Sequence, residues 1–368
     1  MKVPVNEPVI TDEAKALVKE AMDTGWVSSA GPSIEQFERE FAAFIGVKHA
    51  ITVTNGTAAL HLALASLNIG PGDEVIVPAF TMIASVFAIQ YTGATPIFID
   101  SEPDTFNMDV SQLEAKITKK TKAILPVHIY GHSVDMDPLL DIARRHNIPV
   151  VEDAAEAHGG TYKGRMCGSM GTISCFSFYG NKIVTTGEGG MVVTNDDALA
   201  KRARLLRDLA HAEGRRFWHE EVGYNYRMTN LQAALGLGQL RHVHGFVEKK
   251  LWMANAYQKG LSGIEGIRLP ITKDYAKNVY WMYGVLVEPD CPLTRDQLRA
   301  ALQEKGIDTR DFFLSAAAMP ACTQFAKPGE KFPVADDLGA RGFYLPSGLA
   351  LTEEQVAYVC TTLESILA

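Results

Sequence analysis

The sequence predicts an α/β protein built on a mainly parallel sheet, because strand-like and helix-like segments alternate through its first two thirds. The strand-like segments are short, largely apolar runs at 50–54, 74–78, 96–100, 123–128 and 149–153. Alternation of this kind is typical of βαβ units, whose helices cover both faces of a parallel sheet. The length of 368 residues, 47% of them hydrophobic, is enough for one large domain and a smaller one.

The helices between the strands follow from apolar residues at helical spacing. Leu60 and Leu64 lie on one stripe of a helix that we expect at 57–67. Thr229 and Gln232 fit a capping box, so another helix is expected to begin there. The other predicted helices span 82–91, 138–146, 248–261, 294–305 and 352–367.

The pattern changes near residue 246, which divides the chain into two predicted domains. Residues 1–245 would form the large domain, with a β-rich stretch at 172–194. Residues 246–368 would form a smaller α+β domain that includes a strand at 279–287. We expect roughly the first 25 residues to pack beside this smaller domain.

Composition excludes several classes of function. The formal net charge is −8 and no segment is dense in Lys and Arg, so we expect no nucleic-acid partner. Neither an apolar leader nor a run of about 18 apolar residues is present, so we expect no membrane partner. The five cysteines are dispersed without a CxxC pair, which is typical of reduced thiols in the cytoplasm. His128 and His132 have no third ligand nearby, so no metal site is expected.

Lys182 and Asp153 carry the strongest indication of function. Lys182 follows the β-rich run 175–178, and Asp153 ends the apolar run 148–153. A lysine can form a Schiff base with pyridoxal 5′-phosphate (PLP), and a carboxylate can keep the ring nitrogen of that cofactor protonated. The alternative for Asp153 is an internal salt bridge, since a buried carboxylate needs a partner. We interpret the pair as the catalytic residues of a PLP enzyme.

Three residues fit the phosphate of the same cofactor. Gly56 and Thr57 stand where a strand meets a helix, and free N–H groups at a helix start suit a phosphate. The alternative is a simple helix cap. Ser177, five residues before Lys182, could donate to the same phosphate.

Other residues fit the ring or its surroundings. Phe80 follows the strand at 74–78 and could stack on a flat ring, with a place in the core as the alternative. Glu156 and His158 come soon after Asp153 and are expected to line the same pocket. Asn225 stands on an ordered loop before the helix that begins near 229. It could belong to the surroundings of the cofactor, and the alternative is hydrogen bonding within the loop.

With these residues assembled, the chain resembles the DegT/DnrJ/EryC1/StrS family of PLP-dependent sugar aminotransferases. The resemblance runs from about Pro4 to Leu367, and its most specific motifs are at 55–60, 152–155, 177–191 and 223–228. It implies the aspartate aminotransferase fold (fold type I), PLP as cofactor, and a homodimer with shared active sites.

The resemblance also implies a role for each matched residue. Lys182 would be the Schiff-base lysine and proton shuttle, and Asp153 would pair with the pyridine nitrogen. Asn225 would reach the phosphate of the neighbouring subunit's cofactor, so that each site needs two chains. The implied cofactor-binding set is Gly56, Thr57, Phe80, Asp153, Glu156, Ser177, Lys182 and Asn225.

The implied reaction moves an amino group from L-glutamate to C4 of a nucleotide-linked 4-keto-6-deoxy sugar. Lys182 favours transamination, because a dehydratase branch of the family carries histidine there. The turn 185–191 is similar to members that act on C4. Residues 180–183 are similar to the branch that converts GDP-4-keto-6-deoxymannose to GDP-perosamine, as in O-antigen and lipopolysaccharide biosynthesis. The alternatives are a UDP- or dTDP-linked acceptor, or a PLP-binding regulator without catalytic activity.

One segment departs from the family pattern. Where the family often has Arg-Pro-Phe-Phe-x-Pro-x-His near the substrate, this chain has Arg-Asp-Phe-Phe at 310–313 and then lacks the expected histidine. This segment leaves the choice of nucleotide sugar open. The residues that we expect to contact the sugar nucleotide are Arg310, Phe312, Phe313 and His158.

Overall fold

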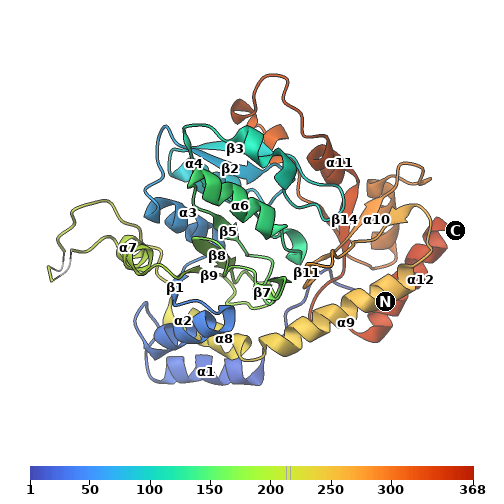
Figure 1. Cartoon of the computed structure of the whole chain (residues 1–368). Coiled ribbons are helices and arrows are strands. Elements are labelled where there is room, and N and C mark those ends of the chain that lie inside the picture. The colour runs from blue at the N-terminus through green and yellow to red at the C-terminus, as the bar shows by residue number, and fades with distance from the viewer. Residues whose placement is uncertain (213, 216) are drawn as a thin grey trace.

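Two groups of hydrogen-bonded strands form the centre of the computed structural model, which describes residues 1–212, 214–215 and 217–368 (Figure 1). One group has the order β1 (His49–Val53), β9 (Gly190–Thr194), β8 (Ile173–Ser177) and β5 (Val151–Asp153). The other has the order β3 (Thr95–Ile99), β2 (Glu74–Pro78) and β4 (Thr121–Ile124). Parallel bridges from Ile124 to Val150 and from Val127 to Asp153 join the two groups.

The predicted α/β class is confirmed, with a sheet that is parallel except at one strand. β2 pairs in parallel with β3 and β4, and β5 pairs in parallel with β8. β9 runs antiparallel to both of its neighbours, β1 and β8. The connection 178–189 from β8 to β9 contains no helix, so the chain returns directly beside β8 instead of crossing over. That connection carries Lys182.

Helices pack against this sheet and against one another. α3 (Gly56–Ser66) lies against β8, β9, α4 (Ala84–Tyr91) and α7 (Asp197–Arg207). Its apolar residues therefore surround it, whereas we predicted a single stripe. α2 (Pro32–Ile45) packs on β1 and α8 (Asn230–Leu240), and α1 (Asp12–Asp23) packs along α8. α8 begins at the predicted capping box of Thr229 and Gln232. The same part contains α5 (Leu113–Lys116) and α6 (Met136–His146).

A smaller antiparallel sheet lies apart from the central one (Figure 1). Its order is β10 (Ile267–Arg268), β12 (Tyr283–Val287), β14 (Gly342–Leu345) and β13 (Arg310–Asp311). β12 starts four residues later than predicted, because Tyr280 has a left-handed backbone with φ +46°. The helices of this part are α9 (Val243–Leu261), α10 (Arg295–Glu304), α11 (Pro333–Arg341) and α12 (Glu353–Leu367).

The N-terminal residues are divided between the two parts. Val3 pairs with Ile307 and belongs to the hydrophobic cluster around the smaller sheet. α1, in contrast, packs on α8. The predicted boundary at 245–246 stays a prediction, because α9 runs through it.

The remaining elements are short. Three two-residue strands form a separate small sheet of β11 (Ala276–Lys277), β6 (Thr161–Tyr162) and β7 (Arg165–Met166). The 3₁₀ turns are η1 (Val110–Gln112), η2 (Ile129–Gly131), η3 (Ala316–Ala318) and η4 (Thr323–Phe325). Among the described residues, no helix is both long and apolar enough to cross a bilayer, and no cluster of His, Cys, Asp and Glu could hold a metal ion.

Candidate active site

A cavity of about 650 Å³ opens at the carboxyl ends of β1, β5 and β8. In an α/β sheet this edge is where the loops gather and ligands bind. Gly56, Asp153 and Ser177 line the cavity and come from these strand ends. Tyr344 of β14 and Trp281, which comes just before β12, also line the cavity. The site therefore lies between the two sheets.

Lys182 enters this cavity from the connection between β8 and β9. Its side chain is 9% exposed, and its Nζ lies 3.6 Å from Oε1 of Glu156. The same Nζ lies 3.5 Å from the centre of the Trp281 ring. Burial lowers the pKa of Lys182, while the carboxylates of Glu156 and Asp153 oppose that shift. The amine is therefore deprotonated, and nucleophilic, at a lower pH than an exposed lysine would be.

Asp153 ends β5 beside the cavity and is almost fully buried. Its Oδ2 accepts a hydrogen bond of 2.7 Å from Oγ of Ser85, and its Oδ1 accepts one of 3.1 Å from the N–H of Ala155. It forms no direct ion pair within the part of the chain that the structure describes, and burial raises the pKa of its carboxyl. A buried carboxylate is costly without a positive partner, so Asp153 is suited to a cationic group in the cavity.

Glu156 is a second buried carboxyl beside the amine. The backbone N–H of Tyr130 donates to its Oε2 at 2.7 Å. Burial raises the pKa of Glu156 to about 7, although the charge of Lys182 opposes the shift. This carboxyl can therefore hold or release a proton near neutral pH next to the Lys182 amine.

The turn from β1 into α3 faces Ser177. Oδ1 of Asn55 accepts a hydrogen bond of 2.8 Å from the N–H of Ala58 and caps the helix. A Cβ at Gly56 would lie 2.7 Å from Cβ and 3.1 Å from Oγ of Ser177, so a side chain at this position does not fit without movement. Gly56 and Thr57 thus bring a helix start and the Ser177 hydroxyl to one side of the cavity, an arrangement that suits a phosphate group.

Comparison with known proteins identifies the family. The sequence profile of the DegT/DnrJ/EryC1/StrS aminotransferase family matches residues 8–364. The chain belongs to this family. It is 47% identical over 361 residues to the GDP-perosamine synthase of Escherichia coli O157:H7, covering 98% of this chain and 97% of that protein. It is 46% identical over 367 residues to the GDP-perosamine synthase of Caulobacter vibrioides, covering 100% of this chain and 98% of that protein.

Solved structures agree with this membership. The aminotransferase from Psychrobacter cryohalolentis has a TM-score of 0.92 to this chain at 34% identity, covering 99% of this chain and 98% of that one. The PLP form of a Streptococcus pneumoniae protein has a TM-score of 0.93 at 28% identity, covering 100% of this chain and 98% of that one. This DegT-family chain is thus a PLP-dependent aminotransferase with the predicted fold.

The structure of this aminotransferase separates Glu156 from His158, which we expected in one pocket. Glu156 lines the cavity, whereas the imidazole of His158 is fully buried against Phe176 and Phe178. Burial lowers the pKa of His158 to about 3. We therefore correct the expectation that His158 contacts the sugar nucleotide: it lies behind the cavity wall.

Phe80 also lies outside the cavity lining. The N–H of Ala316 donates to the carbonyl of Ala79 at 2.7 Å, and the backbone of Phe80 bridges to Ser315. This pairing leaves the Phe80 ring 1% exposed, against aromatic rings of the core. The side chain that lines the cavity from this segment is Met82, which is 45% exposed. Stacking of Phe80 on a cofactor ring is therefore not compatible with its position.

Only part of the predicted substrate segment, residues 310–313, lines the cavity among the residues that the structure describes. Phe313 lines the cavity, as expected. Phe312 is buried under β12 and β14, where a Cβ added to Gly342 would lie 1.9 Å from its ring. Arg310 is outside the lining of the cavity and pairs with Asp308 at 3.0 Å, but its partner across the strands, Tyr344, lines the cavity. A direct contact of Phe312 with a substrate in this cavity is not compatible with its burial, whereas the contact of Arg310 with the sugar nucleotide stays a prediction.

Asn225 lies on the exposed surface, and it does not line the cavity of its own chain. Its backbone pairs with that of Asp208, close to the end of α7. The role that the resemblance gives it, toward a neighbouring subunit, stays a prediction.

Sequence reasoning missed Trp281, Tyr344, Ser85 and Met82, all of which line the cavity. The dense aromatic run 280–283 was a usable signal for Trp281, but it predicts a strand equally well. Tyr344 and Ser85 carry no local signal, because they reach the cavity only through packing between segments distant in sequence.

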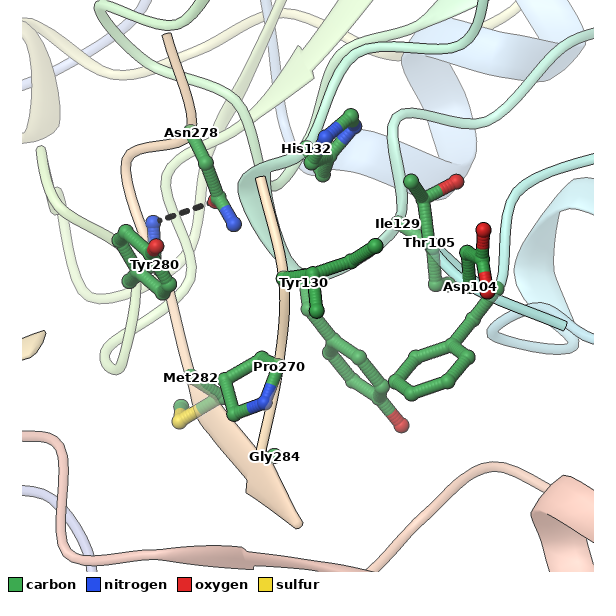
Figure 2. Close-up of a pocket in the computed structure, with 12 residues that line it drawn as sticks. Asp104, Thr105, Ile129, Tyr130, His132, Pro270, Asn278, Tyr280, Met282 and Gly284 are labelled. Atoms are coloured by element: carbon green, nitrogen blue, oxygen red, sulfur yellow. Dashed lines mark hydrogen bonds between the residues drawn. The ribbon is translucent and has the colours of Figure 1, made fainter. Parts of the chain in front are cut away.

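A smaller hollow lies beside Tyr130 (Figure 2). It is bounded by Ile129 to His132 on one side and by Asn278 to Gly284 on another, and it measures about 20 Å³. That volume is room for about one water molecule. It is too small for a substrate. The cavity around Lys182 is the candidate active site because it holds a buried amine beside two buried carboxyls.

Proposed function

We propose that this aminotransferase moves the amino group of L-glutamate to C4 of GDP-4-keto-6-deoxymannose and so makes GDP-perosamine, for O-antigen or another polysaccharide. The observation that carries this proposal is the likeness to two GDP-perosamine synthases along the whole chain. The position of Lys182 between Glu156 and Trp281 in a cavity beside Asp153 supports a catalytic protein over a regulator.

The residues of the cavity fit PLP. Asp153 is buried without an ion pair within the described chain, and the pyridine nitrogen of PLP would supply the missing positive partner. Gly56, Thr57 and Ser177 would hold the phosphate at the start of α3. When bound, PLP supplies an electron-withdrawing ring that stabilises negative charge on the carbon that bears the transferred nitrogen.

The chain's own residues would handle the protons of the reaction. Lys182 Nζ would take the proton from Cα of L-glutamate, and in the second half would deliver a proton to C4 of the sugar. Glu156, 3.6 Å away, favours the protonated form of the amine between these events. Burial of the Lys182 side chain keeps the amine easier to deprotonate.

A second copy of the chain would complete the site. The described residues after α7, at 208–212 and 217–222, extend away from the rest of the chain in Figure 1. Phe217 is 74% exposed and Val222 is 83% exposed, an amount of apolar surface that suits a protein partner. Asn225 lies just beyond, and in a dimer it would reach the neighbouring subunit's cofactor. The five cysteines are free, which supports a cytoplasmic location.

The acceptor is tested with a panel of GDP-, UDP- and dTDP-linked 4-keto-6-deoxy sugars, supplied with PLP and L-glutamate. We expect kcat/KM for the GDP-linked sugar to exceed the others by at least about tenfold, which corresponds to ~1.4 kcal/mol. The product mass should show exchange of the keto oxygen for an amino group. A preference for a UDP- or dTDP-linked sugar would replace the proposed acceptor, and no turnover with any of them would favour the regulator.

A further inference from the structure

Lys250 is a buried lysine outside the cavity. It lies on α9 and is 1% exposed. Its Nζ donates to the carbonyl of Trp281 at 2.9 Å and also to the carbonyl of Ser347. Within the described residues it has no carboxylate partner, so carbonyl oxygens alone satisfy this ammonium. Burial lowers the pKa of Lys250 to about 7.

Trp281 is fixed at its backbone and at its ring. Its carbonyl accepts from Lys250, and its indole Nε1 donates to the carbonyl of Asn181 at 2.8 Å. Asn181 immediately precedes Lys182, whose Nζ lies 3.5 Å from the centre of the indole ring. Direct contacts therefore run from Lys250 through Trp281 to the reactive amine.

Ser347 gives Lys250 a second anchor at the same place. Oγ of Ser347 accepts a hydrogen bond of 3.0 Å from the N–H of Tyr283, and its N–H donates to the carbonyl of Val5 at 2.8 Å. Lys250 thus ties together the segment that enters β12 and the segment that leaves β14. An apolar side chain would fill the same space without the cost of burying a charge. The donor hydrogens are therefore the property of Lys250 that this position uses.

We propose that Lys250 is a positioning residue, whose Nζ–H groups hold the backbone of Trp281 so that the indole face stays on Lys182. The face of an indole ring attracts an ammonium, so this contact favours the protonated form of Lys182. Loss of the contact would lower the pKa of Lys182 by roughly one unit. The inference rests on the role proposed for Lys182, but it can be tested on the amine itself.

The test measures the pKa of Lys182 in the cofactor-free protein. Acetic anhydride at a limiting concentration labels free amines, and peptide mass spectrometry follows the labelling of Lys182 across neutral and alkaline pH. We expect Lys250→Met and Trp281→Leu each to lower this pKa by about one unit, and the double variant to lower it no further. Lys249→Met is the matched control, because Lys249 is on the same helix but lies over Trp252, at 3.6 Å from its ring.

Two outcomes would overturn the proposal. The first is a pKa of Lys182 that is unchanged or raised in Lys250→Met, and the second is an additive effect in the double variant. If Lys250→Met does not fold, Lys250→Leu takes its place, because its side chain also lacks donor hydrogens, and it must likewise lower the pKa of Lys182. The measurement needs neither PLP nor a sugar. A result that overturned the role of Lys250 would therefore not affect the proposed acceptor.

Discussion

Lys182 is buried between a carboxyl and an aromatic ring, and these neighbours shift its pKa in the direction opposite to the effect of burial. Burial lowers the pKa of the amine, whereas Glu156 and Asp153 raise it. A base with a tuned pKa of this kind is what proton transfer at carbon requires. Replacing Lys182 or its neighbours therefore tests the proposed chemistry most directly.

Replacing Lys182 should remove the reaction and leave the fold. We expect Lys182→Ala to lower kcat by at least about 10³-fold, because the proton shuttle is gone. Borohydride reduction of the native holoenzyme, followed by peptide mapping, should label Lys182. Lys163→Ala is the control, since Lys163 is exposed and pairs with Asp137 away from the cavity. A label on another lysine would remove Lys182 from its proposed role.

Asp153 should matter through its charge. Asp153→Asn keeps the shape and can still accept from the N–H of Ala155, while its Nδ2 would donate to Oγ of Ser85, but it cannot hold a proton on the pyridine nitrogen. We expect kcat to fall about 10²-fold. Ser85→Ala removes only one hydrogen bond to the carboxylate and should cost about tenfold or less. Equal losses in the two variants would contradict a role for the charge itself.

Glu156 should shift the pH dependence. Its carboxylate favours the protonated form of Lys182, so its removal lowers the pKa of the amine. Lys182 acts as a base when it is deprotonated, and kcat therefore rises with pH on the acid side. In Glu156→Gln this rise should move to lower pH, measured as kcat across the range in buffers of constant ionic strength. A rise that stays in place would show that Glu156 does not act on the amine.

At the scale of elements, the junction of β1, α3 and β8 is tight enough to exclude a methyl group at Gly56. Gly56→Ala would push against Ser177, with a cost of about 1–3 kcal/mol, and should weaken PLP binding about tenfold or more. Spectroscopic titration of the apoprotein with PLP measures this affinity. Gly245→Ala is the matched control: nothing lies within 4 Å of its added Cβ, so PLP affinity should not change. Equal affinities in the two variants would contradict the proposed phosphate site.

The same elements show what the sequence can predict. Asp153 and Ser177 end strands, and Gly56 begins a helix, so their common edge follows from the βαβ pattern alone. Phe80 was misplaced because local position after a strand does not determine which way a loop side chain turns; the pairing of 79–80 with 315–316 does. Trp281 and Tyr344 enter the site only when the smaller sheet packs against the larger one, and no local spacing encodes that contact.

If the whole molecule is a homodimer, as proposed, its two chains should share their active sites. Lys182→Ala and Asn225→Ala chains should each be inactive or weak, because each defect touches every site of its homodimer. When the two variants are mixed in equal amounts and exchange subunits, half of the dimers contain one chain of each kind. Such a dimer would carry both defects in one site and none in the other. Activity should then recover to about a quarter of the native value.

The control for this mixture uses two defects that belong to the same cavity. Lys182 and Asp153 line one cavity of one chain, so mixing Lys182→Ala with Asp153→Asn leaves a defect in every site and restores nothing. If Asn225 acted only within its own chain, its mixture with Lys182→Ala would behave like this control. Recovery in the first mixture and its absence in the second therefore require that Asn225 crosses to the other subunit, which a structural defect at position 225 could not imitate.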